Sequence, residues 1–224
     1  MSLEPEAAPG GGGQLMADRA YVELRDRIVT LRIPPGAPIN EDALGRELDM
    51  GRTPVREAIR RLALENLVAV FPRRGTFASE INITDLAHIS DVRVQLEGHA
   101  SYRAAERLTA RQRAELEALL AEIDALRRQG SAEALMGLDA TVHRFIHRCS
   151  GNPYLEATLG RYFNLSLRIW HLVLDRVPTL GHAVHDQIQL LEAILDRNGP
   201  HARTIMHEHV LAFQREILAA FSRR

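Results

Sequence analysis

The sequence predicts a mainly α-helical protein in two parts, and three observations predict this fold. Apolar residues recur every three to four positions along most of the 224 residues, which is the period of an amphipathic helix. The period changes to two only between Leu67 and Ser79, which is the period of a β-strand. Positive charge gathers before residue 80, whereas all ten histidines lie at His88 or later. We therefore expect a small basic part with one hairpin and a larger part that is entirely helical.

Composition excludes several kinds of chemistry. All 28 basic residues are arginines, so neither a lysine Schiff base nor the phosphate-binding lysine of a P-loop is available. Cys149 is the only cysteine, which rules out an internal disulfide and suits a cytoplasmic protein. The chain has no apolar run of ~18 residues, so we expect no membrane span. The glycine-rich segment 1–14 is expected to be a flexible tail.

Three helices are predicted before the hairpin. The apolar stripe of the first helix consists of Tyr21, Leu24, Ile28 and Leu31. This helix should end before Pro34, and a second should begin after Asn40, a good N-cap residue. A third should open with Thr53 as its N-cap and Pro54 as its first residue, and should run toward Leu67.

The hairpin follows directly. Residues 67–71 and 76–79 are predicted as two strands, joined by a turn at 72–75. Three short helices followed by a two-stranded wing form a winged helix-turn-helix, which we assign to residues 15–80. In that fold the N-terminal residues of the third helix face the major groove of DNA.

Positive side chains fall on both parts of this fold that would face DNA. The candidate DNA-binding residues are Arg52, Thr53, Arg56, Arg60, Arg73, Arg74 and Gly75. The helical group is placed to read guanine edges and clamp phosphate, and the turn to reach the backbone or the minor groove. An ordinary solvated surface would explain any one of these arginines, but not a basic helix start together with a basic turn. Single-strand binding is disfavoured because the segment offers few aromatic side chains for stacking.

Everything after residue 83 is predicted as helix, in an all-α bundle of about six helices over 83–224. Thr84 should cap a long helix that runs toward Leu108, and Thr109 with Gln112 forms a capping box for the next. Four more helices are predicted, at about 131–149, 153–176, 180–197 and 201–222.

Polar residues on the apolar faces of these helices mark a candidate buried site. Asp139 and His143 are four residues apart and share one helix face, which offers oxygen and imidazole to a metal ion. A hydrogen-bonded Asp–His pair without metal is the alternative. By their spacing His209 and Gln187 also point inward, and His147 is a reserve ligand on the side of His143.

The basic part resembles a known family. The run Arg52–Leu62 (RTPVREAIRRL), followed by Pro72–Phe77 (PRRGTF), is similar to the signature of the GntR family of bacterial transcription regulators. Two positions depart from that signature. Gly51 stands where the family usually has Ser or Thr, which removes a hydroxyl contact to phosphate. Asn66 replaces a glycine, at a position where Asn tolerates a left-handed backbone.

The helical part resembles the ligand-sensing domain of the FadR branch of this family. The resemblance is carried by Arg93, Leu96-Glu97, Asp139 to His143, Asn152 to Leu155, Glu192 to Ile194 and His209. It implies a divalent metal ion (Zn, Ni or Mn), with Asp139, His143 and His209 as ligands and Gln187 at the position of a third histidine. It further implies an effector carboxylate bound by Arg93, with Asn152 as a second candidate. A salt bridge from Arg93 to Glu97 on the same helix is the alternative for the arginine.

The resulting hypothesis is a homodimeric transcription regulator. Two winged helices would bind a pseudo-palindromic double-stranded operator, while the helical domain would dimerise and hold a small organic-acid effector. One rival is a metal-dependent enzyme in which Asp139, His143 and His209 activate water and the basic part is an accessory nucleic-acid-binding head. A second rival is a DNA-architecture protein without any effector.

Overall fold

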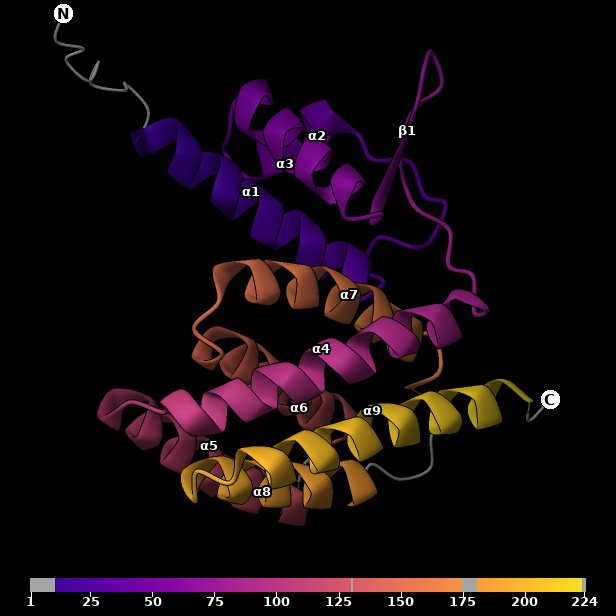
Figure 1. Ribbon diagram of the computed structural model, residues 1–224. Coiled ribbons are helices and arrows are strands. Elements are labelled where there is room, and N and C mark those ends of the chain that lie inside the picture. Colours follow the sequence, from indigo (N-terminus) through magenta and orange to yellow (C-terminus); the bar gives the residue numbers. More distant parts are fainter. Residues whose placement is uncertain (1–10, 130, 175–180, 223–224) are drawn as a thin grey trace, which may run out of the picture. The chain divides into compact units, whose positions relative to one another are not determined.

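The computed structural model describes residues 11–129, 131–174 and 181–222 (Figure 1). The chain divides into two compact units, one ending at Ile81 and the other beginning at Asn82. The first unit contains α1 (Gly11–Val29), α2 (Glu41–Glu47), α3 (Arg52–Leu64), β1 (Val68–Phe71) and β2 (Gly75–Ala78). The second contains α4 (Asp85–Arg107), α5 (Ala110–Gln129), α6 (Ala132–Cys149), α7 (Pro153–His171), α8 (Gly181–Leu195) and α9 (Gly199–Ser222). The predicted fold class, three helices with a two-stranded wing and then a helical bundle, is confirmed.

The core of the first unit forms where α1 packs against α3. Leu24 and Ile28 of α1 and Val55 and Leu62 of α3 are fully buried there. Removing such side chains from water supplies most of the stability of a domain this small, at ~1.5–3 kcal/mol for each large side chain. The burial also fixes which face of α3 points outward, because its opposite face is held against α1.

Two predictions about α1 are wrong at its ends. The helix begins at Gly11, inside the expected tail 1–14, because a helix anchored by buried residues extends outward at little cost per residue. It ends at Val29, so Leu31 does not belong to its apolar stripe and instead has a left-handed backbone with φ +59°. The remaining tail residues, 1–10, lie outside the described part of the chain.

The starts of α2 and α3 differ in their capping. Asn40 caps α2 as predicted, since its Oδ1 accepts a hydrogen bond from the backbone N–H of Ala43 at 2.9 Å. By contrast, α3 begins at Arg52 with Gly51 as its N-cap, so the prediction that Thr53 is the N-cap is wrong. Pro54 does not locate the start of the helix to a single residue. The first backbone N–H groups of a helix have no intrahelical partner, so proline fits more than one position of the first turn.

The wing is a single antiparallel pair. Val68 pairs with Ala78 and Phe71 with Gly75, so the strands lie within one residue of their predicted bounds. The tip between them needs unusual backbone angles, with φ +63° at Arg73 and φ +105° at Gly75. Glycine adopts the second angle without the steric cost that a side chain would add.

The left-handed conformation expected at Asn66 is also observed, with φ +64°. Asn tolerates this region better than most residues, since its short polar side chain can bond locally. The chain can therefore turn sharply between α3 and β1 without a glycine.

In the second unit, α4 lies along the bundle and packs against α6, α7, α8 and α9 (Figure 1). Close packing with α9 needs a small residue, because a Cβ at Gly98 would collide with the ring of His207. The capping box of α5 is confirmed, as Gln112 Oε1 accepts from the Thr109 N–H at 3.0 Å while Thr109 Oγ1 accepts from the Gln112 N–H at 3.3 Å.

Other helix ends differ from the predictions. Thr84 precedes α4, but its hydroxyl does not cap the helix because its backbone is already helical, with φ −66° and ψ −23°. The helix expected over 153–176 ends at His171, and 175–180 lie outside the described residues. Within the described part, no helix is both long and apolar enough to cross a lipid bilayer.

Candidate functional site

One face of α3 carries exposed arginines. Val55, Ala58, Ile59 and Leu62 are buried on the opposite face. The predicted DNA-binding residues of this helix are therefore exposed: Arg52, Thr53, Arg56 and Arg60. Because side chains four residues apart lie one turn apart, the three arginines form a row along the helix.

The two leading arginines are paired with acids of α2. Arg52 Nε lies 2.7 Å from Asp42 Oδ1, and Arg56 Nε lies 2.8 Å from Glu41 Oε2. The Arg52 side chain is 69% exposed and that of Arg56 is 59% exposed. Solvent screens exposed pairs of this kind and leaves them weak, so phosphate or base acceptors can replace the acids.

Arg61, which directly follows this row, has a structural role instead. It pairs with Asp18 and lies over the ring of Tyr21, with its guanidinium carbon 4.1 Å from the ring centre. The Tyr21 hydroxyl in turn donates to Glu65 at 2.9 Å, and burial together with the charge of Glu65 raises the pKa of Tyr21 to about 12. These contacts tie α3 to α1 and hold the exposed row in place.

The wing tip is the second basic feature of this unit. Arg73, Arg74 and Gly75 are all exposed. The guanidinium carbon of Arg74 lies 5.7 Å from the ring centre of Phe71, which itself packs edge-on against Phe77. The tip therefore presents positive charge on a short, braced hairpin.

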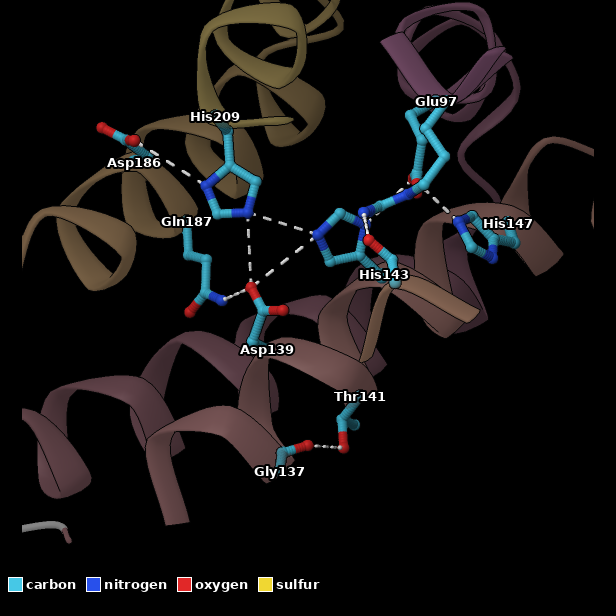
Figure 2. A network of polar contacts seen from close by, with 11 residues as sticks. Glu97, Gly137, Asp139, Thr141, His143, His147, Asp186, Gln187 and His209 are labelled. Atoms are coloured by element: carbon cyan, nitrogen blue, oxygen red, sulfur yellow. Dashed lines mark hydrogen bonds and ion pairs between the residues drawn. The ribbon is translucent and has the colours of Figure 1, made fainter. Parts of the chain in front are cut away.

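The second unit contains a buried cluster of acids and imidazoles (Figure 2). Its members come from four helices: Arg93 and Glu97 from α4, Asp139, His143 and His147 from α6, Gln187 from α8 and His209 from α9. Each of these residues is at most 5% exposed. In Figure 2 the ring of His143 lies between two groups, with Asp139 and His209 on one side and Glu97 on the other.

Asp139, His143 and His209 form a triangle of possible ligand atoms. His143 Nε2 lies 3.3 Å from His209 Nε2, and Asp139 Oδ1 lies 3.4 Å from His209 Nε2 and 3.7 Å from His143 Nε2. Ligand atoms about 2.1 Å from a tetrahedral Zn²⁺ are about 3.4 Å apart. The three side chains therefore fit a divalent metal ion without rearrangement.

The pKa values of the three residues in this triangle depend on one another. Burial alone would lower the pKa of His209, but hydrogen bonds and charges from Asp139 and Asp186 outweigh it and raise the pKa to about 9. Burial would raise the pKa of Asp139, yet His143, His209 and the Gln187 hydrogen bond hold it below its usual value. For His143 burial prevails and lowers the pKa, which favours the neutral ring that can ligate a metal.

Gln187 reaches the triangle with its nitrogen rather than its oxygen. Its Nε2 donates to Asp139 Oδ1, while its buried Oε1 has no hydrogen-bond partner among the described residues. An amide N–H cannot ligate a metal, so in this orientation Gln187 supports Asp139 instead. Turning the amide by half a rotation would place the oxygen toward the triangle.

Glu97 accepts hydrogen bonds from three side chains on the other side of His143. Its Oε1 accepts from Arg93 Nε at 3.0 Å and Nη2 at 2.8 Å. Its Oε2 lies 2.9 Å from His143 Nδ1 and 2.8 Å from His147 Nε2. Burial opposes ionisation, but these three partners outweigh it and hold the pKa of Glu97 well below its ordinary value.

A small pocket of about 10 Å³ lies beside the triangle, which is room for about one water molecule. Its polar lining is Arg93, Asp139, His143 and His209, and its apolar lining is Phe163, Leu167, Trp170, Val210 and Phe213. An apolar wall with a few converging polar groups is typical of a ligand site, although this pocket is far smaller than the usual ~300–1,000 Å³. A ligand larger than a water molecule would require the lining side chains to move apart.

The structure brings together five of the six effector and metal candidates. Arg93, Asp139, His143, Gln187 and His209 meet at this cluster, whereas Asn152 does not line the cavity. Asn152 is the N-cap of α7, and its Oδ1 accepts from the backbone N–H groups of Tyr154 and Leu155 at 3.1 and 3.3 Å. For Arg93 the contact to Glu97 named as the alternative is present, but buried rather than exposed.

Sequence reasoning did not identify the contacts of Glu97 with the histidines, or the place of Ser166, whose Oγ accepts from Arg93 Nη1 at 2.8 Å. Glu97 lies four residues after Arg93 and His147 four residues after His143, so helical spacing placed each pair on one face. No sequence signal indicated that those two faces meet.

Comparison with known proteins agrees with this architecture. Residues 16–78 match the model of the bacterial regulatory proteins of the gntR family, and residues 88–212 match that of the FCD domain. An HTH-type transcriptional regulator from an unstable DNA locus of Streptomyces ambofaciens is 31% identical over 86% of this chain and 80% of its own length. The HTH-type transcriptional repressor RspR of Escherichia coli is 24% identical over 94% of this chain and 91% of its own.

Solved structures share the fold. E. coli McbR/YncC matches with a TM-score of 0.79 and 23% identity over 92% of this chain and 97% of its own. A metal-free FCD domain, that of TM0439, matches with a TM-score of 0.53 and 18% identity over 65% of this chain and its whole length. The chain therefore belongs to the gntR family of bacterial regulatory proteins, with an FCD domain as its second unit, and is a transcriptional regulator rather than an enzyme.

Proposed function

We propose that the protein is a homodimeric repressor or activator whose affinity for a DNA operator is set by a small carboxylate held in the FCD domain beside a divalent metal ion. The observation that carries this proposal is the shared cavity. The guanidinium of Arg93 and the triangle of Asp139, His143 and His209 line the same small pocket. A side chain suited to anions and a set of side chains suited to a metal ion therefore face one pocket.

The first unit supports binding to double-stranded DNA. A row of exposed arginines runs from the start of α3, where a recognition helix enters the major groove. Gly51 leaves the first turn of α3 without a side-chain cap, so its backbone N–H groups are open to phosphate. The wing residues Arg73 and Arg74 would contact the neighbouring backbone. On binding, Arg52 and Arg56 would exchange Asp42 and Glu41 for DNA acceptors.

Asp139, His143 and His209 would hold the metal ion. Two imidazoles and one carboxylate suit Zn²⁺, Ni²⁺ or Mn²⁺, with Gln187 as a fourth ligand only after its amide turns. When bound, the ion supplies a positive charge that accepts an oxygen donor of the effector. In its absence His209 carries a proton in the space between Asp139 and His143, as its raised pKa indicates.

Arg93 would hold the effector carboxylate. A guanidinium has five N–H donors, and the contacts to Glu97 and Ser166 use three of them. The remaining donors can meet an anion from the cavity side. The rings of Phe163 and Trp170 line the apolar wall, which favours a short organic acid over a long polar one, and these side chains would have to move to admit it.

The dimer would connect the two functions. A two-fold dimer presents two recognition helices to half-sites separated by whole turns of DNA. An effector alters operator affinity only if it binds one arrangement of the dimer better than the other. The proposal therefore needs an effector that distinguishes two arrangements of the recognition helices.

The test begins with protein stripped of metal by a chelator. Zn²⁺, Ni²⁺ and Mn²⁺ are titrated by calorimetry, and short carboxylates are then screened by thermal shift and by the fluorescence of Trp170, the only tryptophan, which lines the cavity. We expect binding at one site per chain. Gln187→His should tighten metal binding by adding an imidazole ligand, and Arg93→Gln should abolish the carboxylate response.

Arg111→Gln is the matched control for the arginine variant. The Arg111 side chain is 90% exposed, pairs with Glu115 and does not line the cavity. No uptake of metal by the wild type or by Gln187→His would refute the metal site. A carboxylate response that survives in Arg93→Gln would refute the anion site.

A further inference from the structure

We propose that His147, acting through Glu97, positions both Arg93 and the ligand histidine His143, and so couples the anion side of the cavity to the metal side. This inference rests on the proposed function of the cavity. His147 itself does not line the cavity, and it would act without touching either ligand.

Glu97 is saturated with donors. Arg93 donates twice to Oε1, and His143 and His147 each contact Oε2, at 2.9 and 2.8 Å. The Glu97 side chain is completely buried, so no water competes for these positions. A carboxylate with four charge-assisted or imidazole donors in a dry interior holds all its partners firmly.

These contacts fix the tautomer of His143. An ionised carboxylate only accepts hydrogen bonds, so both Nδ1 of His143 and Nε2 of His147 must carry a hydrogen. His143 Nε2 then keeps its lone pair, and it is this atom that faces Asp139 and His209 (Figure 2). A carboxylate behind a histidine ligand is a recurrent way to orient the ring and raise its basicity.

The contact with His147 determines which partners each carboxylate oxygen of Glu97 meets. A guanidinium usually binds a carboxylate through two nitrogens, one to each oxygen. Here Nε and Nη2 of Arg93 both donate to Oε1 of Glu97. His147 helps to hold Oε2 away from Arg93 and toward His143. Without this donor, Glu97 can turn both oxygens to Arg93, which leaves His143 without its partner and ties up the guanidinium.

Phe163 braces the same arrangement. Its ring centre lies 4.7 Å from that of His143, 5.9 Å from that of His147 and 5.0 Å from the guanidinium carbon of Arg93. The aromatic ring thus covers all three donors to Glu97 and limits their movement. A change at His147 is therefore taken up by Glu97 rather than by a shift of the rings.

The alternative, a second metal site at Glu97, His143 and His147, is disfavoured by charge. Their ligand atoms do lie within 4.8 Å of one another. A cation there would displace two hydrogen bonds to Oε2 and would lie next to the guanidinium of Arg93, which is 2.8 Å from the same carboxylate. We therefore expect one metal ion per chain and a positioning role for His147.

The experiment compares His147→Leu with His147→Gln. Glutamine places an amide N–H near the position of His147 Nε2, whereas leucine fills space and donates nothing. Calorimetric titration of Zn²⁺ should show affinity reduced ~10–100-fold in His147→Leu and restored to near the wild-type value in His147→Gln. The visible spectrum of the Co²⁺-loaded protein should shift in the leucine variant only. Cys149→Ala is the matched control, since Cys149 is a buried α6 residue outside the cluster.

A metal-independent measurement separates this inference from the proposed function. Nitrogen-15 NMR of the chelator-treated protein should show His143 as the Nδ1–H tautomer in the wild type and in His147→Gln, and a changed state in His147→Leu. If the tautomer behaves in this way but no metal binds, the positioning stands and the proposed function fails. An unchanged tautomer and metal affinity in His147→Leu, or equal losses in both variants, would overturn the inference.

Discussion

His209 is a buried imidazole whose charged form is stabilised by two acids. Asp139 and Asp186 raise its pKa to about 9, while an exposed histidine titrates near pH ~6.5. A raised pKa in the folded state means that the folded protein binds the proton more tightly than the unfolded chain. The corresponding stabilisation is complete below the unfolded pKa and is lost as the pH rises through the folded one.

We therefore expect the melting temperature of the metal-free protein to fall as the pH rises from ~6.5 to ~9, because His209 loses its proton over this range while buried against two acids. Scanning fluorimetry in the presence of a chelator measures this directly. Bound metal replaces the proton, so the metal-loaded protein should show a smaller decline. An equal decline in His209→Gln would show that another group is responsible.

Arg52 is the exposed arginine nearest the start of α3, and we expect Arg52→Ala to weaken operator binding by roughly 1–3 kcal/mol and to relax sequence preference. The physical reason is the loss of a two-pronged contact to a guanine edge. Fluorescence anisotropy on the operator and on random duplex provides the comparison, with Arg111→Ala as the control. Unchanged discrimination between the two DNAs would remove Arg52 from base reading.

At the scale of elements, the wing should contribute affinity without sequence information. Arg74 at its tip is exposed, and its guanidinium lies beside the ring of Phe71. We expect Arg74→Ala to weaken binding to all duplexes alike and to reduce the slope of log affinity against log salt by about 0.9, the value for one phosphate contact. The titration is repeated at several salt concentrations, and an unaltered slope would show that Arg74 does not touch phosphate.

Helical periodicity predicted the elements and the inward faces well. Asp139, His143, His209 and Gln187 were placed correctly because each lies on an apolar face of a long helix. Local signals also located the capping box of α5 and the left-handed Asn66. Both depend only on neighbours in sequence, where propensity and hydrogen-bonding chemistry decide the outcome.

The predictions that failed concern features that residues nearby in the sequence do not determine. The start of α3 depends on how the chain leaves α2, and proline fits more than one position there. The partners of Glu97 come from α4 and α6, so only the packing of those helices reveals them. Asn152 matched the family pattern as part of a segment, yet its side chain satisfies two backbone groups of α7.

On the scale of the whole molecule, the near-neutral net charge of −1 conceals a division between a basic unit and an imidazole-rich one. Local positive charge at α3 and at the wing is what phosphate encounters, so the overall charge does not prevent DNA binding. The proposed operator site and the proposed anion site therefore lie in different units of one chain.

The proposed operator and effector sites lie in separate units, and thermodynamic linkage makes any influence between them reciprocal. If a carboxylate effector with metal changes operator affinity by some factor, the operator must change effector affinity by the same factor, typically ~5–150-fold. Anisotropy of labelled operator gives the first factor, and Trp170 fluorescence with and without saturating operator gives the second. Arg93→Gln should bring both factors to one while leaving basal operator affinity unchanged. A change in operator affinity without the matching change in effector affinity would mean that the acid acts on DNA binding outside the cavity.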